Sequence, residues 1–405
     1  MNERFDIVIA GGGLAGLTLA ALLAQCAESR GLRLTLVDAA PRPVHEPDDD
    51  IALRVSAIAT GSAALLDGIG AWPFVQAARV CAYDRMRVWD ESVPASSRAT
   101  LRFDAAEFAV PQLGFIVENV LMRHAILDVL DRHDVELIFA TAIDSLQYDG
   151  ERSRLRLDNG RELRADLVIG ADGIQSFVRQ SVGIETHDWP YGQSAFVTHL
   201  RPEKPHRNTA WQRFLEDGPL GMLPLPDGRI SVVWSTSESR VAVALEASDD
   251  KLGQTLSKAS DWVLGELRAS GPRGAFPLCA RHAERYVLPG VALIGDAAHS
   301  VHPLAGQGAN LGLQDAATLA GILQSALANG EHPGDRPVLR RYERARKGAN
   351  ATMLHFMTGL NRLFATDSAV IRQLRTAGMR LFNYSGPIRE HVVNVALGAR
   401  GGRSH

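Results

Sequence analysis

The chain has 405 residues, of which 46% are hydrophobic and 22% charged, and its formal net charge at pH 7 is -3. This length exceeds the usual size of one hydrophobic core, so we expect two domains or one domain with a large insertion. The balanced composition is that of a globular protein, and the small negative charge argues against binding to nucleic acid.

Cysteine usage and the amino terminus indicate the compartment. Cys26, Cys81 and Cys279 are odd in number and widely spaced, which argues against a disulfide framework and against a metal site. We therefore expect a reducing compartment, the cytoplasm, and no bound metal. The first residues lead into an apolar strand without the regions of a secretory signal. No apolar run approaches the roughly eighteen residues of a membrane span, so any contact with the inner membrane is expected to be peripheral.

The first predicted unit is a strand, a glycine turn and a helix. Residues 5–10, FDIVIA, predict a buried strand, and GGGLAG and an apolar helix follow. Gly11 permits the tight turn, Gly13 lets the backbone approach a pyrophosphate, and Gly16 lets helix and strand pack closely. A second strand, LRLTLV, ends at Asp38, about twenty residues beyond the glycines, where a carboxylate accepts hydrogen bonds from an adenosine ribose. This unit predicts a dinucleotide site.

The next segments introduce two arginines. Arg54 lies in LRVSAIA, at the start of a helical pattern that runs to Trp72. Its planar guanidinium suits a pyrophosphate, and a surface arginine is the alternative. Residues 74–115 change to short mixed strands, which we interpret as the first part of an inserted domain. A helix from about residue 120 to 132 follows, with Arg123 in its first turn.

A small β-meander is predicted at residues 137–139, 153–157 and 162–163. Then ADLVIGADGIQSFVR, residues 165–179, repeats the pattern of an apolar strand that stops at glycine and acid before a helix. Asp172, the acid of this unit, either caps the helix that follows or contacts a ligand.

Residues 185–283 return to strand patterns, among them RISVVWS. Within it Ser231, Val233 and Ser235 share one face of the predicted strand, and the alternate residues share the other. Both faces are partly apolar, which fits either a wall of an apolar cavity or a larger core.

Residues 291–316, VALIGDAAHSVHPLAGQGANLGLQDA, combine a third strand, an acid and a glycine-rich loop. The strand stops at Gly295 and Asp296, at the edge where ligands bind in open α/β sheets. A loop holding Gly306 and Gly308 leads into a helix, and the amides at a helix start have no partner inside the helix. We expect this end to bind an anion or to stabilise negative charge that forms during a reaction.

Beyond residue 351, apolar side chains recur at helical spacing in two further helices, and Arg372, Arg375 and Arg380 border the second. An apolar face beside arginines can lie on an anionic membrane. Packing against the sheet is the alternative that we favour.

Three of these segments together carry a family resemblance. GGGLAG, ADLVIGADGIQSFVR and the string from GDAAH to GQGANLG resemble the fingerprints of the class A flavoprotein monooxygenases, which include p-hydroxybenzoate hydroxylase (PHBH). LRVSAIA, LGFIVEN, AWQRFLEDGPLGMLPL, SVVWS and RRYERARK resemble more narrowly the ubiquinone-biosynthesis hydroxylases of the UbiH/UbiF/UbiI (VisC) family. Asp38 stands where many members have Glu, which leaves the carboxylate acceptor in place. The WxWxIP segment of flavin-dependent halogenases does not occur.

The resemblance implies an α/β fold: a Rossmann-like FAD-binding domain of the PHBH type, an inserted mixed β-sheet substrate domain, and C-terminal helices. The expected segments are 1–73, 116–184 and 285–350 for the FAD-binding domain, 74–115 and 185–284 for the substrate domain, and 351–405 for the C-terminal helices.

The resemblance also implies FAD as cofactor, NAD(P)H and O2 as co-substrates, and hydroxylation of the aromatic ring of a polyprenylated phenol or benzoquinol in ubiquinone biosynthesis. A non-catalytic FAD-binding scaffold subunit of a ubiquinone-biosynthesis complex stays open as an alternative, as does a related flavin-dependent lipid reductase or epoxidase. Other ubiquinone-biosynthesis proteins are expected partners, and no motif indicates the oligomeric state.

In this family reading, Asp296 would hold the ribityl chain of FAD, and amides at the start of the helix after the loop would face the flavin. The expected cofactor-binding residues are Gly11, Gly13, Leu14, Ala15, Gly16, Asp38, Arg54, Arg123, Asp172, Asp296, Gly306, Gln307, Gly308, Ala309 and Asn310. Pro303 is expected to shape the loop beside the reacting centre. His302 is the candidate base, and His299, His199 and His206 are other histidines among which the sequence does not decide. For each of them a structural role is the alternative that we favour.

Overall fold

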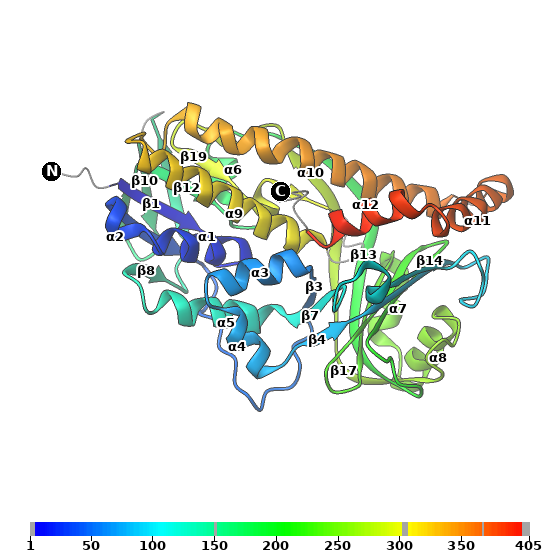
Figure 1. Cartoon of the computed structure of the whole chain (residues 1–405). Coiled ribbons are helices and arrows are strands. Elements are labelled where there is room, and N and C mark those ends of the chain that lie inside the picture. Colours follow the sequence, from blue (N-terminus) through cyan, green and yellow to red (C-terminus); the bar gives the residue numbers. More distant parts are fainter. Residues whose placement is uncertain (1–4, 150–151, 302–306, 367, 399–405) are drawn as a thin grey trace.

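The computed structural model describes residues 5–149, 152–301, 307–366 and 368–398. A six-stranded sheet lies at one end of the molecule and an eight-stranded sheet at the other, and the long helix α10 (Arg336–Ala365) extends over both (Figure 1). This arrangement confirms the predicted α/β class with a second, mixed sheet.

The six-stranded sheet carries the three strand–turn units. In spatial order its strands are β18 (Val287–Leu288), β19 (Val291–Leu293), β12 (Leu167–Gly170), β1 (Phe5–Ala10), β2 (Leu32–Val37) and β8 (Val135–Ile138). All neighbours are parallel except β18 and β19. The last residues of β1, β12 and β19 are in register, with Ala10 opposite Gly170 and Gly170 opposite Leu293. The three predicted turns therefore leave the same edge of the sheet side by side.

Helices cover this sheet because its strands are apolar on both faces. Helix α1 (Leu14–Ala24) contacts β1 and β2 and packs against α5 (Asn119–Leu130) and α9 (Gln307–Ala328). The buried side chains of these three helices share one apolar core with the sheet. The remaining short helices of this half are α2 (Ala27–Arg30), α3 (Thr60–Gly68), α4 (Trp72–Ala78) and α6 (Phe177–Ser181).

Two three-stranded sheets differ from the expectations. One consists of β9 (Ile143–Tyr148), β10 (Ser153–Leu157) and β11 (Glu162–Ala165). The segment 137–139, expected in this meander, instead supplies part of β8, since its apolar side chains extend the parallel sheet beside β2.

The other small sheet is formed by β3 (Val55–Ile58), β7 (Gly114–Glu118) and β4 (Cys81–Tyr83). The helical pattern predicted from Arg54 to Trp72 is therefore wrong over β3. Pairing with β7 overrides the helical propensity of this short segment, and the helix starts only at Thr60.

The eight-stranded sheet is mixed, with β14 and β5 parallel and the other neighbours antiparallel. In spatial order its strands are β20 (His299–Ser300), β17 (Leu267–Ala283), β13 (Thr186–Pro202), β16 (Ile230–Ser237), β15 (Gly218–Pro224), β14 (Thr209–Leu215), β5 (Arg85–Asp90) and β6 (Leu101–Asp104). One face packs against α7 (Glu238–Glu246) and α8 (Asp249–Ala259) over a core that includes Phe196 and Trp234.

The small sheet of β3, β7 and β4 combines strands from both sides of the predicted boundary at residue 73, and β20 joins the second sheet from the segment 285–350. The division into domains accordingly stays a prediction.

The C-terminal part differs from the expected pair of helices. Residues 351–365 are not a separate helix but the last part of α10. The apolar side chains of α10 pack against β14 and β15. Two more helices follow, α11 (Ala369–Asn383) and α12 (Gly386–Ala396).

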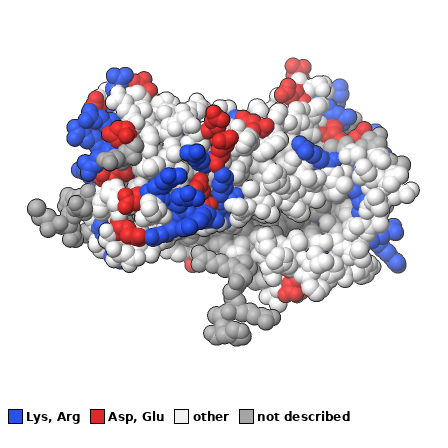
Figure 2. Space-filling view, turned by 90° about the horizontal axis from the view of Figure 1, so that it is seen from above, with Lys and Arg blue, Asp and Glu red and all other residues white. Residues whose placement is uncertain are grey.

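Charged side chains in Figure 2 gather densely over the end of the molecule where α10 begins, and at the end where α11 lies they stand apart within a larger uncharged surface. Of the residues that the structure describes, none belongs to a helix long and apolar enough to cross a membrane.

Candidate functional site

A cavity of about 780 Å³ lies between the carboxyl edge of the six-stranded sheet and one face of the eight-stranded sheet. This volume is within the range of about 300 to 1,000 Å³ found for small-molecule sites. The lining comes from the turns after β1, β12 and β19, from the segment around Arg54 with the start of α9, and from the second sheet together with α12.

The glycine turn after β1 forms one end of the cavity. Gly11 has φ +108°, and a Cβ there would lie 2.3 Å from the carbonyl oxygen of Ala171. A Cβ on Gly16 would lie 2.0 Å from the oxygen of Gly11. Gly13 differs, since a Cβ there would meet no atom within 4 Å, and it lines the cavity together with Leu14. The backbone is thus open to the cavity at Gly13 and closely packed behind it.

Helix α1 begins beside this opening without a side-chain cap and without an acidic residue in its first turn. Its first amides therefore keep their affinity for an anion. Leu14 and Ala15, both predicted at the cofactor, line the cavity here.

Asp38 and Arg123 lie behind the glycine turn. The Asp38 carboxylate accepts hydrogen bonds from the amides of Gly12, at 2.6 Å, and Ala40, at 2.7 Å. Arg123 Nε donates to the carbonyl oxygen of Gly12 at 2.8 Å, and Nη2 lies 3.7 Å from Asp38 Oδ2. Burial lowers the pKa of Arg123, and Asp38 opposes that shift. The structure thus joins both predicted residues to the turn, with Arg123 lining the cavity.

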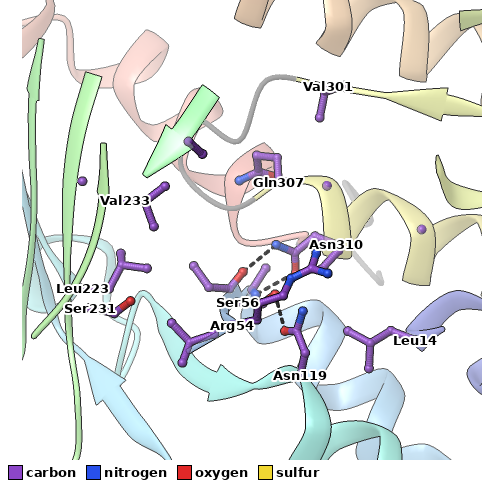
Figure 3. A pocket seen from close by; sticks show the side chains of 18 of the residues that line it. Leu14, Arg54, Ser56, Asn119, Leu223, Ser231, Val233, Val301, Gln307 and Asn310 are labelled. Carbon is purple, nitrogen blue, oxygen red and sulfur yellow. Dashed lines mark hydrogen bonds between the residues drawn. The ribbon is translucent and has the colours of Figure 1, made fainter. Parts of the chain in front are cut away.

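Arg54 lies at the middle of the cavity, between the second sheet and the start of α9 (Figure 3). Its guanidinium carbon is 5.1 Å from the ring centre of Phe276, a cation–π distance. Nearby, Ser56 Oγ donates to Asn119 Oδ1 at 2.6 Å. Arg54 is exposed to the cavity, so its charge is available to a ligand.

Asp296 and the first turn of α9 face the same space. Protein surrounds the Asp296 carboxyl except towards the cavity, and this desolvation raises its pKa, with His299 and Arg54 acting in the opposite direction. On α9, Gln307, Gly308, Ala309 and Asn310 line the cavity.

The Asn310 side chain fixes the start of α9 against the segment after β3. Its Oδ1 accepts from the amide of Ala59 at 2.9 Å, and its Nδ2 donates to the carbonyl oxygen of Ala57 at 2.9 Å (Figure 3). His302, Pro303 and Gly306, which were predicted in the preceding loop, lie outside the described residues.

Asp172 lies in the turn after β12 and, like Asp38 but unlike Asp296, does not line the cavity. Its Oδ2 accepts from the amide of Val178 at 3.0 Å, at the start of α6, and desolvation raises its pKa. Gly173 lines the cavity, whereas Asp172 is not among the lining residues. The carboxylate therefore has the capping role that the sequence left open, and its contact with a cofactor stays a prediction.

A buried network that the motifs did not indicate holds the turn after β19. Asp315, on α9, has no exposed surface. Its Oδ2 accepts from the amide of Gly295 at 3.1 Å and pairs with His299 Nε2 at 2.5 Å. Its Oδ1 accepts from Arg346 Nε at 2.7 Å and Asn350 Nδ2 at 3.1 Å.

Burial alone would raise the pKa of the Asp315 carboxyl, but His299 and Arg346 outweigh it and hold the pKa below its usual value. The available signal was a lone carboxylate within an apolar helix, LGLQDAATLAG. His299 is thus engaged with Asp315 behind the turn, and His206 is engaged at both ring nitrogens, with the amide of Asn208 and the carbonyl oxygen of Leu225.

The second sheet forms the far wall. The face of β16 with Ser231, Val233 and Ser235 lines the cavity, and the alternate face packs into the core with α7 and α8. In Figure 3 the side chains of Leu223, Ser231 and Val233 point from this sheet towards Arg54 and Gln307. The cavity then continues between apolar side chains of the β4–β7 region and the C-terminal helix. These residues are Tyr83, Met86, Phe103, Leu113, Val393 and Leu397.

Comparison with known proteins adds the family. Residues 4–357 match the model of the FAD binding domain family. The chain is 37% identical to the 3-demethoxyubiquinol 3-hydroxylase of Escherichia coli, over 98% of this chain and 99% of that protein. It is 34% identical to the human mitochondrial ubiquinone biosynthesis monooxygenase COQ6, over 97% of this chain and 92% of that protein.

Among solved structures, p-nitrophenol 4-monooxygenase PnpA of Pseudomonas putida has the same fold, with a TM-score of 0.77, 18% identity, and coverage of 99% of this chain and 100% of that one. PqsL of Pseudomonas aeruginosa, solved with 2-aminobenzoylacetate, has a TM-score of 0.75 at 23% identity, covering 93% of this chain and 99% of that one.

Proposed function

The chain belongs to the FAD-binding-domain family and is related over nearly its whole length to ubiquinone-biosynthesis hydroxylases, and from this premise we propose its reaction. It is an FAD-dependent monooxygenase that uses NAD(P)H and O2 to hydroxylate the aromatic ring of a polyprenylated phenol or benzoquinol in ubiquinone biosynthesis. The observation that carries the proposal is the continuity of the cavity. Its polar end is built by glycines, arginines and Asp296, and its other end is apolar and reaches α12.

The polar end fits FAD. Gly13 leaves open space beside the unpaired amides of α1, as a pyrophosphate requires. Arg123 and Arg54 add positive charge along the same side. Of the predicted cofactor-binding residues, those that line the cavity are Gly13, Leu14, Ala15, Arg54, Arg123, Asp296, Gln307, Gly308, Ala309 and Asn310. Gly11, Gly16 and Asp38 would support the turn that holds the pyrophosphate, and a contact of Asp172 with the cofactor stays a prediction.

When bound, FAD supplies the hydride acceptor for NAD(P)H and the group that activates O2. The protein's own contribution is placement and electrostatics. The start of α9 presents backbone amides to the cavity, which suits negative charge on a reduced ring. The apolar wall around Val233 and Leu223 keeps water from the reacting ring.

The apolar end suits the prenyl tail. It runs between Met86 and Phe103 on one side and Val393 and Leu397 on the other, so a hydrocarbon chain would leave the reacting centre beside α12. Burial of such a chain is favourable at about 25 cal/mol per Å² of apolar surface. A tail held there would add affinity without contact with the reacting atoms.

We further propose that α11 and α12 contact the membrane in which a polyprenylated substrate dissolves. Their exposed apolar side chains include Leu374, Leu381 and Ile388, at 66%, 72% and 63% exposure. On α11, Arg372 precedes Leu374 and Arg380 precedes Leu381, and cations beside an apolar face complement an anionic lipid surface. A ubiquinone-biosynthesis protein bound at the same face is the alternative occupant.

Anaerobic reduction of the bound flavin tests the proposed reaction. We expect NADH or NADPH to bleach the flavin absorbance, and a short-chain prenylphenol to accelerate that bleaching. A matched ring without the prenyl group is the control for the apolar end. If the protein holds FAD but neither donor reduces it with any prenylated ring, it is a scaffold subunit and not a hydroxylase.

A further inference from the structure

The cavity face of the second sheet is built from cross-strand rows of side chains. On β13 and β16, Val197 lies opposite Val233, and both line the cavity. The next row places His199 opposite Ser231, with Leu223 of β15 opposite Ser231 on its other side. Directly opposite residues of an antiparallel pair point to the same face. His199 and Ser231 therefore belong to the cavity side, where Ser231 is a lining residue.

This row contains polar groups without hydrogen-bond partners among the described residues. Ser231 Oγ has none, and neither ring nitrogen of His199 has one. Both residues are 0% exposed. The hydroxyl of Ser270 is a third such group, and it neighbours Gly271, whose added Cβ would lie 3.1 Å from the Cβ of His199. Buried polar groups in folded proteins are almost always hydrogen-bonded, so a cluster of unpaired ones indicates a ligand-binding position.

The charges around His199 are already paired with one another. Arg229 forms ion pairs with Asp50 and Asp227, and its Nη1 donates to the carbonyl oxygen of Ser270 at 3.0 Å. Desolvation, together with Arg229, lowers the pKa of His199. The imidazole is therefore neutral near pH 7 and offers one donor and one acceptor.

The row of His199, Ser231 and Leu223 lies across the cavity from the residues predicted to bind the cofactor. Ser231 and Leu223 point across the cavity towards Arg54, and the start of α9 with Gln307 lies beyond it (Figure 3). Most other lining side chains of this sheet are apolar, Val197, Val233 and Leu223 among them. A ring with one hydroxyl group would thus find a polar position within an apolar wall.

Building on the proposed function, we propose that Ser231, backed by His199, binds a hydroxyl group of the substrate's aromatic ring. The Ser231 hydroxyl contacts the ring oxygen, and His199, opposite Ser231 on the neighbouring strand, supplies a second polar group at the same position. This polar contact sets the rotation of the ring in the cavity and so determines which ring carbon is hydroxylated.

The test compares two ligands in oxidised, FAD-loaded protein: a short-chain prenylphenol and its O-methyl ether, which cannot donate a hydrogen bond. Binding is followed by the change in flavin fluorescence, without NAD(P)H. We expect the wild-type protein to bind the phenol about tenfold more tightly than the ether, within the range of one hydrogen bond at a buried polar group. In Ser231→Ala that ratio should fall to near one, and in His199→Leu it should also shrink.

Ser194→Ala is the matched control, since Ser194 is buried in the same sheet at a position outside the cavity lining. It should keep the wild-type ratio. If the ratio of phenol to ether affinity is unchanged in Ser231→Ala and His199→Leu, the proposed contact between Ser231 and the ring hydroxyl is overturned, but the proposed function is not. The same follows if the wild-type protein binds phenol and ether equally. A wild-type protein that holds FAD but binds neither ring overturns the proposed function as well. A product hydroxylated at a second ring carbon in Ser231→Ala would support the role in orientation directly.

Discussion

Asp315→Asn is the substitution that tests the buried network most sharply. The amide keeps the shape of the side chain but removes the charge opposite Arg346, which is 9% exposed as a residue. Each carboxylate oxygen of Asp315 has two contacts. The substitution replaces one of these oxygens by an NH2 group, which cannot accept the hydrogen bonds made there. Breaking a buried ion pair by removing one partner costs about 3 to 5 kcal/mol, and we expect a loss of that size in the free energy of unfolding.

The network also positions the turn that carries Asp296, because the amide of Gly295 donates to Asp315. We therefore expect Asp315→Asn to retain less FAD after gel filtration, even under conditions in which it stays folded. Urea unfolding in excess FAD and flavin content are the two measurements. Glu331→Gln is the control, since the Glu331–Arg341 ion pair is on the solvent-facing side of the same region and is screened.

Surface substitutions usually change the free energy of unfolding by less than about 1 kcal/mol. If Asp315→Asn lowers the free energy of unfolding by no more than that, the charge of Asp315 does not have the structural role assigned to it. Normal stability combined with lost FAD would place the role of Asp315 at the turn alone.

Three further outcomes follow from single positions. Gly11→Ala should purify without flavin because its Cβ would lie 2.3 Å from a backbone oxygen, whereas Gly321→Ala, with open space around it, should retain flavin. Burial lowers the pKa of His282 from 6.5 to about 4. As the pH drops through that interval, the unfolded chain takes up a proton that the folded chain does not, so the free energy of unfolding should fall. His282→Gln should flatten this pH dependence in urea titrations at several pH values. Leu381→Asp on α11 should reduce co-sedimentation with anionic vesicles. Val243→Asp should not, since Val243 is 60% exposed on α7, which packs on β13, β16 and β17 rather than beside α11; equal binding by both variants would leave the face of α11 and α12 to a partner protein.

The turns of the FAD-binding half were predictable because each consists of local sequence: an apolar strand, then glycine or acid, then a helix. Register placed the three turns together, since the ends of β1, β12 and β19 coincide. Gly11 and Gly16 could be recognised because their requirement is steric and holds wherever the chain makes this turn.

Interactions between segments distant in the chain were not predictable in the same way. β3 was mistaken for the start of a helix because its pairing partner, β7, lies about sixty residues further on. Asp315 and Arg346 lie on different helices, and only packing shows that they meet. The polar row of His199 and Ser231 likewise depends on the pairing of β13 with β16.

The proposed function requires that one cavity bring FAD and a prenylated ring together for oxygen transfer. Its most direct test is a single turnover of NAD(P)H-reduced protein with a short-chain prenylphenol under 18O2, followed by mass analysis of the ring product. We predict a product that carries one oxygen-18 atom on the ring. Consumption of NAD(P)H with hydrogen peroxide as the only oxygen product, and an unchanged ring, would contradict the claim.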